Sequence, residues 1–313
     1  MQFLHETKID FIGLRKYGYL LTAICLLISF AHMGYVKSQT GHWLRWGIDF
    51  SGGILIDIKF KEPLQEEKIR EALNSMNLEE LTIQRVGQMA NEFRIRTREK
   101  VLTTEAKTHI ADLIVEQLKQ KFPTNPFTIP DEAAVGASVA GDFIKNAIIA
   151  TISAWICIII YLFYRFEFKF GAAGVFALIH DTLITLGALS IMNKEITLLV
   201  FAGILTNIGY SIHDTIIIYD RIRENRKIQR RMEFADIINL STNQTLSRTI
   251  LTVLTVLMVE LTLFFFGGQI IQDFVFTLLV GLVTGSFSSI YVASPIILEW
   301  MKLEKRRSIK KAA

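Results

Sequence analysis

The chain has 313 residues, of which 51% are apolar, and it carries a formal net charge of +4. A positive mean hydropathy over this length is typical of an integral membrane protein with room for one soluble domain. The basic residues lie beside apolar runs, so the charge does not indicate a nucleic-acid-binding protein. Both cysteines, Cys25 and Cys157, lie within apolar runs, and we expect neither a disulfide nor a metal site.

Six charge-poor runs are each long enough to cross a bilayer as a helix. The sequence therefore predicts an α-helical membrane protein with six transmembrane helices and an external domain between the first two. The helices are expected at residues 17–36, 146–164, 170–192, 196–219, 249–267 and 274–298.

The distribution of lysine and arginine predicts the orientation of these helices. The 220–248 connection carries seven basic residues and the tail 299–313 carries six. The short connections after the third and fifth predicted helices carry almost none. We therefore expect the N-terminus (1–16), the tail and the 220–248 connection to be cytoplasmic, and the 37–145 segment to be external.

The 37–145 segment has the sequence pattern of a folded domain followed by a lead-in to the second helix. Apolar and polar residues alternate as in strands at 53–60, 81–86 and 92–97, and a short strand is expected at 127–129. Helical spacing covers 65–76 and 103–122. The order β-α-β-β-α-β predicts an α+β ferredoxin-like domain, a fold that does not specify a function by itself.

Three glycines lie within seven residues just after the first predicted helix, in the stretch Gly47-Ile48-Asp49-Phe50-Ser51-Gly52-Gly53. Such a cluster indicates backbone torsions or close approaches that a side chain would prevent. We interpret Gly47, Asp49, Gly52 and Gly53 as a structural motif. A phosphate-binding loop is the alternative, but the stretch lacks the Lys-Ser/Thr ending and the following helix.

The 196–219 helix contains a carboxylate, Asp214, inside its apolar run. A carboxylate in hydrocarbon costs a few kcal/mol, so it normally faces a bundle interior or takes part in function. Asn207, Ser211 and Asp214 are spaced to form a polar stripe on one helix face. Two interpretations are open, a polar packing group buried among helices and a protonatable group of a transporter.

Six segments carry a resemblance to a known family, in matching order and spacing. They are GIDFSGG at 47–53, FALIHDTLITLGAL at 176–189, GYSIHDTIIIYDRIREN at 209–225, TLSRTILT at 245–252, FFGG at 265–268 and GSFSSIYVASP at 285–295. The chain resembles the SecD/SecF family of the bacterial Sec protein-export machinery, which is related to the resistance-nodulation-division superfamily. The resemblance implies six helices with one external domain, a place in the bacterial cytoplasmic membrane, and no cofactor.

The resemblance also implies partners. They are a SecD-like subunit, a SecYEG-like channel, a YajC-like subunit, unfolded secretory proteins and membrane lipids, with no nucleic acid among them.

Asp214 and Arg248 are the first pair of candidate proton-coupling residues. Both are expected near the cytoplasmic ends of neighbouring helices, within roughly 6 Å of each other in depth. An ion pair would offset the cost of burying either charge. The resemblance implies a proton-coupling role for these two positions, and a static ion pair that fixes helix register is the alternative.

Asp181 and Glu260 are two further candidates for proton coupling. Asp181 follows His180 near the middle of the third predicted helix, and the string Ile-His-Asp-Thr recurs at 212–215. Adjacent helical residues point about 100° apart, which disfavours a shared metal, so hydrogen-bonded packing or a relay role remains. Glu260 stands where the family usually has an apolar residue. It is either a neutral packing group or a stepping stone between external water and Asp214.

No enzyme signature is present in the sequence. We therefore predict a subunit of a proton-motive-force-driven complex that assists Sec-dependent protein export. The alternative is half of a small-molecule proton-antiport exporter, although an external domain of roughly 90 residues leaves little room for a drug pocket. A purely structural scaffold is the third interpretation.

Overall fold

The computed structural model describes residues 7–76, 78, 81–85, 91–97, 104–135 and 137–312. The chain divides into two compact units. One consists of residues 1–45 and 151–313 and is built from long apolar helices. The other, residues 46–150, contains the only sheet in the described part of the chain. Helix α5 (Ala137–Arg165) contributes residues to both units.

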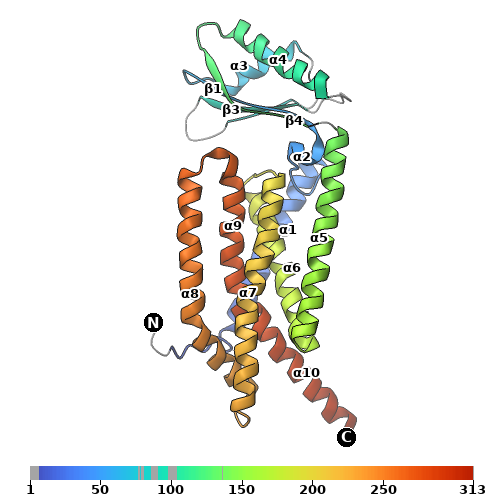
Figure 1. Cartoon of the computed structure of the whole chain (residues 1–313), viewed down its shortest axis with the longest axis vertical. Coiled ribbons are helices and arrows are strands. Elements are labelled where there is room, and N and C mark those ends of the chain that lie inside the picture. The colour runs from blue at the N-terminus through green and yellow to red at the C-terminus, as the bar shows by residue number, and fades with distance from the viewer. Residues whose placement is uncertain are drawn as a thin grey trace. The chain divides into compact units, whose positions relative to one another are not determined.

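The sheet of the smaller unit has four antiparallel strands in the order β2-β3-β1-β4. Helices α3 and α4 cover one face of it (Figure 1). Alternate side chains of the central strand face these helices, because side chains alternate across a strand. The elements are β1 (Gly53–Phe60), α3 (Glu66–Asn74), β2 (Thr82–Arg85), β3 (Glu92–Thr97), α4 (Thr104–Lys121) and β4 (Phe127–Val135).

The expected elements of this unit are found with shifted ends. The last strand extends to Val135, well beyond the expected 127–129. Within the predicted 81–86 strand, residue 86 lies outside the described residues, as does residue 103 of the predicted helix 103–122. The glycine stretch contains a short helix, α2 (Ile48–Ser51), which the sequence did not predict.

Two glycines of the motif, Gly52 and Gly53, have the positive φ values that a glycine-rich stretch indicates. Gly52 has φ 68° and Gly53 has φ 129°, and both values lie in a region that side chains disfavour. Gly47 has ordinary extended torsions at the N-terminal end of α2, where its carbonyl accepts from the Ser51 hydroxyl at 2.9 Å. The motif therefore serves a tight passage from α2 into β1.

The larger unit contains α1 (Arg15–Thr40), the second half of α5, and six further helical segments among the described residues. They are α6 (Phe168–Ile191), α7 (Leu198–Ile228), α8 (Phe234–Phe266), α9 (Gln269–Ser288), the π-helical segment η1 (Ser289–Ala293) and α10 (Ser294–Ala312). In this unit α7 lies alongside α9, with α6 and α8 as further neighbours of α9 (Figure 1).

Five helical segments of the described chain are long and apolar enough to cross a membrane, against six expected from the sequence. They correspond to α1, α5, α6, α8 and the continuous path Ile271–Glu304 through η1. The predicted 196–219 helix lies within α7, which is outside this group because buried polar side chains such as Asn207, Ser211 and Asp214 lower its apolar content. Helices α7 and α8 also extend into the predicted 220–248 connection, leaving only 229–233 between them.

The N-terminal segment is fixed to the start of α8 by two asparagines. Asn243 accepts from the Ile9 N–H at 3.0 Å and donates to the Ile9 carbonyl at 2.8 Å. Asn239 accepts from the Ile12 N–H at 2.9 Å and donates to Asp10 at 2.7 Å. Two hydrogen bonds lower the pKa of Asp10. The larger effect comes from the backbone N–H of Gly13, and the smaller from the side chain of Asn239. The stabilisation from the Asp10 contacts is therefore present above the usual pKa of an aspartate and is lost as the pH falls through the lowered pKa of Asp10 in the folded protein.

Helices α7 and α9 approach closely at two glycines that are one turn apart on α9. A Cβ at Gly281 would lie 1.8 Å from Asn207 Nδ2, and a Cβ at Gly285 would lie 2.9 Å from Ser211 Cβ. Small residues spaced in this way allow helix backbones to approach in membranes. Here they let two polar side chains of α7 lie against the backbone of α9.

Gly281→Ala is expected to destabilise this contact. The new methyl group overlaps an amide that Thr277 holds through its carbonyl at 2.7 Å, so the helices must separate. Overpacking of this kind costs about 1–3 kcal/mol. The matched control is Gly209→Ala on α7, where a Cβ meets nothing within 4 Å. Thermal unfolding in detergent should show a lower midpoint for the first variant only; equal midpoints would contradict the proposed contact.

Candidate functional site

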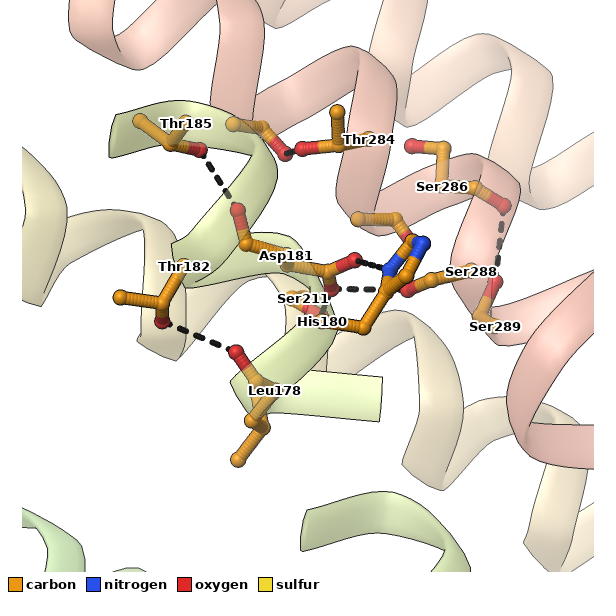
Figure 2. A network of polar contacts seen from close by, with 12 residues as sticks. Leu178, His180, Asp181, Thr182, Thr185, Ser211, Thr284, Ser286, Ser288 and Ser289 are labelled. Carbon is orange, nitrogen blue, oxygen red and sulfur yellow. Dashed lines mark hydrogen bonds and ion pairs between the residues drawn. The ribbon is translucent and has the colours of Figure 1, made fainter. Parts of the chain in front are cut away.

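Asp181 of α6 lies at the centre of a buried polar network that joins three helices (Figure 2). Its Oδ2 accepts from the Ser211 hydroxyl of α7 at 2.5 Å and from the Ser288 hydroxyl of α9 at 2.7 Å. Its Oδ1 lies 2.8 Å from His180 Nδ1. Asp181 is 5% exposed and His180 is 3% exposed, so both act away from solvent.

The contacts of Asp181 are those of an acceptor. Each serine hydroxyl has one proton, and Ser288 is closer to Asp181 than to the Gly285 carbonyl at 3.1 Å. Hydrogen bonds to a charged acceptor are stronger than neutral ones. A carboxylate supplied with donors from two other helices is well suited to hold α6, α7 and α9 together.

Asp214 of α7 has fewer hydrogen-bond contacts than Asp181 in the described part of the chain. It is 7% exposed, and Ser286 of α9 lies 3.2 Å from its Oδ2. The Ser286 hydroxyl lies closer to its own helix, at 2.9 Å from the Leu282 carbonyl. If Ser286 donates to Leu282, its oxygen is available to accept from a protonated Asp214. The geometry therefore accommodates both protonation states of this side chain.

The structure shows no ion pair between Asp214 and Arg248 among the described residues, although the sequence suggested one. Arg248 lies on α8 with an exposed side chain, and Asp214 contacts Ser286 of α9 instead. The expected agreement in depth follows from helix rise alone. Formation of an ion pair depends also on how α8 is rotated about its axis, which the rise does not specify.

Glu260 of α8 is a further buried carboxylate, in addition to Asp181 and Asp214. It is 4% exposed, and its Oε2 has no hydrogen-bond partner among the described residues. It is the one buried charged side chain of α8 in the described chain. An isolated carboxyl group in such surroundings is disfavoured in its charged form.

The serines at the end of α9 and the start of η1 are functional candidates that the sequence did not reveal. Ser286 and Ser288 contact the two aspartates, and Ser289 accepts through its carbonyl from Ser294 at 2.8 Å. The available signal was a run of hydroxyl residues inside an apolar span. Within the described residues, no cluster of three or more His, Cys, Asp or Glu side chains could hold a metal ion.

Comparison with known proteins identifies relatives over nearly the whole chain. Residues 114–303 match the family model "Protein export membrane protein SecD/SecF, C-terminal", and residues 39–64 match the SecD/SecF GG motif. A protein translocase subunit SecF from Endomicrobium trichonymphae is 36% identical over 99% of this chain and 97% of its own length. One from Desulfurispirillum indicum is 40% identical over 93% of this chain and 91% of its own length.

A solved structure shares the fold. SecDF from Thermus thermophilus, described as a translocon-associated membrane protein, matches with a TM-score of 0.81 and 31% identity. The match covers 95% of this chain but only 39% of the SecDF chain.

Ser288→Ala is expected to destabilise the three-helix network. It removes a hydrogen bond to a buried carboxylate, which contributes about 1.5–3 kcal/mol. Ser38→Ala is the matched control, because Ser38 is exposed and donates only to the Tyr35 carbonyl of its own helix. Thermal unfolding measures both variants. A Ser288→Ala protein as stable as the control variant would show that Asp181 does not need this donor.

Proposed function

This chain belongs to the SecF family of protein translocase subunits, and from that membership we propose that it couples the proton motive force to protein export. In this proposal it is a non-enzymatic subunit of a complex that assists Sec-dependent export across the bacterial cytoplasmic membrane.

The burial of Asp214 is the observation that carries the proposal. This carboxylate lies in an apolar helix, with a single hydroxyl group beside it that can donate or accept. Intramembrane ionisable residues with such surroundings are suited to exchange protons. Asp181, by contrast, accepts hydrogen bonds from two serine hydroxyls of neighbouring helices, which suits a role in helix packing.

The energy available from protons is of the right order for a change in helix packing. One proton that crosses a potential of 100 mV supplies about 2.3 kcal/mol. In the proposed cycle, deprotonated Asp214 exchanges Ser286 for Arg248 as its partner, and protonation releases Arg248 again. Such a switch would bias two arrangements of the bundle that differ by a few kcal/mol.

We further propose a topology of six spans, with α7 as the fourth. Basic residues concentrated at 220–248 and 299–313 support cytoplasmic termini. The sheet order β2-β3-β1-β4, with two helices on one face, supports a ferredoxin-like domain, which would lie on the external side. This placement leaves the domain without access to ATP, so a proton-driven device fits the topology.

The proposed direct partner is a SecD-like subunit. This chain spans 39% of the SecDF chain that it resembles, so the remainder of that chain has room for a second half. A SecYEG-like channel, a YajC-like subunit, unfolded secretory proteins and membrane lipids are the further proposed partners. A small-molecule exporter and a passive scaffold are the rival functions, and neither predicts that protein export depends on Asp214.

Asp214→Asn is expected to abolish proton-dependent export of a secretory precursor. The amide keeps the shape of the side chain but cannot release a proton, so the protein should still insert and assemble. Asp220→Asn is the control on the same helix, because Asp220 is half-exposed and pairs with Arg165 at 2.7 Å. Export by the Asp214→Asn variant at the wild-type rate would rule out a proton-carrying role.

Glu260→Gln is expected to slow proton-dependent export if Glu260 passes protons from the external side towards Asp214. Glutamine retains hydrogen bonding but cannot exchange a proton at this position. The control is Glu224→Gln, at an exposed Glu that pairs with Arg221. Wild-type export at every external pH tested would instead assign Glu260 to packing.

A further inference from the structure

A small cavity lies between α6 and α7, beside the Asp181 network. Its volume is about 10 Å³, which is roughly the space needed to hold one water molecule. Asp181, Thr182 and Thr185 of α6 and Asn207 of α7 line its polar part. Leu178, Ile204 and Ile208 line the remainder.

The side-chain oxygens of Asn207, Thr182 and Thr185 in this lining are all available as hydrogen-bond acceptors. Asn207 donates through Nδ2 to the Thr277 carbonyl at 2.7 Å, and its Oδ1 is buried without a partner among the described residues. Thr182 donates to the Leu178 carbonyl at 2.9 Å, and Thr185 donates to the Asp181 carbonyl at 2.8 Å. Each threonine oxygen is therefore left as an acceptor, like Asn207 Oδ1.

We propose that this cavity is a binding site for a single ordered water molecule, held by Asn207 Oδ1 and the threonine hydroxyl oxygens. A buried water needs two to four polar partners, and a lining of acceptors suits the two protons that water donates. Asn207, itself 6% exposed, thereby completes a hydrogen bond that no described side chain supplies.

The position of the site gives this water a place in the proposed proton path, a role that rests on the proposed function above. Asn207 lies seven residues before Asp214 on α7, about 10 Å along the helix axis. In the proposed path, a water held by Asn207 and the threonines beside Asp181 is a candidate carrier between Asp214 and the part of α7 that precedes it.

Radiolytic hydroxyl-radical labelling of the full chain in lipid nanodiscs tests the site, because a bound water produces radicals next to buried side chains. Ile208, which lines the cavity and is 4% exposed, is compared with Ile237, which is 3% exposed and does not line it. We expect severalfold more labelling at Ile208. Equal labelling of the two residues would overturn the proposal.

Two variants and a control test whether the labelling at Ile208 depends on the acceptor atoms that line the cavity. Thr185→Val and Asn207→Leu each remove an acceptor at nearly constant volume, and either should reduce labelling at Ile208 to the level of Ile237. Thr185→Val is the decisive one, because it leaves the Asn207–Thr277 contact intact. Thr206→Val, at an exposed threonine that donates to the Ala202 carbonyl, should change nothing. Unchanged labelling in Thr185→Val would overturn the site.

Two further measurements distinguish the remaining outcomes. They are the dependence of the labelling on the cation in the buffer and the rate of protein export. An acceptor lining also fits a sodium ion, so labelling that changes when sodium replaces choline would identify a cation and overturn the proposal. Wild-type export in Thr185→Val, with labelling lost, would remove the water from the proton path. Normal export in Asp214→Asn would instead refute the proposed function and leave the water site standing.

Discussion

The close approach of α7 and α9 is the constraint on which the buried polar network depends. Gly281 and Gly285 have no Cβ to separate the helices, so Asn207 and Ser211 lie against the backbone of α9. This contact brings Ser211 of one helix and Ser288 of the other to the same oxygen of Asp181. In the hydrocarbon core of a bilayer, bulk water is not available to satisfy a misplaced polar group. Other registers of the two helices are therefore disfavoured.

The π-helical segment η1, which follows Ser288, determines which side chains of α10 face the core of the larger unit. The Ser294 hydroxyl bonds to the carbonyl of Ser289, five residues earlier, and Pro295 has no N–H to continue an α-helical ladder. A π turn adds one residue relative to an α-helix, and removing it would rotate α10 by about 100°. Ile297 and Leu298, now buried in the core of the larger unit, would then face elsewhere. Ser288 and the start of α10 can thus both face inward.

The sequence was sufficient to predict features that depend on the periodicity of apolar residues. It was insufficient for features that depend on how a helix is rotated about its own axis. Alternation located β1 and β3, and apolar runs located the long helices that carry Asp214 and Glu260. Helix rise placed Arg248 near Asp214 in depth, but the rotation of α8 leaves its side chain exposed. Ser286 and Ser288 escaped prediction because serine is common in helix contacts of every kind. Their role follows only from contacts with residues more than 70 positions away.

Helix α9 provides a physical link between the two aspartates. Ser286 contacts Asp214 and Ser288 contacts Asp181, and residues two apart on a helix point about 200° apart around its axis. A change at Asp214 that draws or releases Ser286 therefore acts on the same rigid element that supplies Asp181 with a donor. Asp181 is strongly bonded and Asp214 weakly, so α9 has a fixed point at one serine and a variable contact at the other. In the proposed coupling, a proton at Asp214 changes its contact with Ser286 while the Ser288 bond to Asp181 remains, so Asp181 is as necessary to the coupling as Asp214.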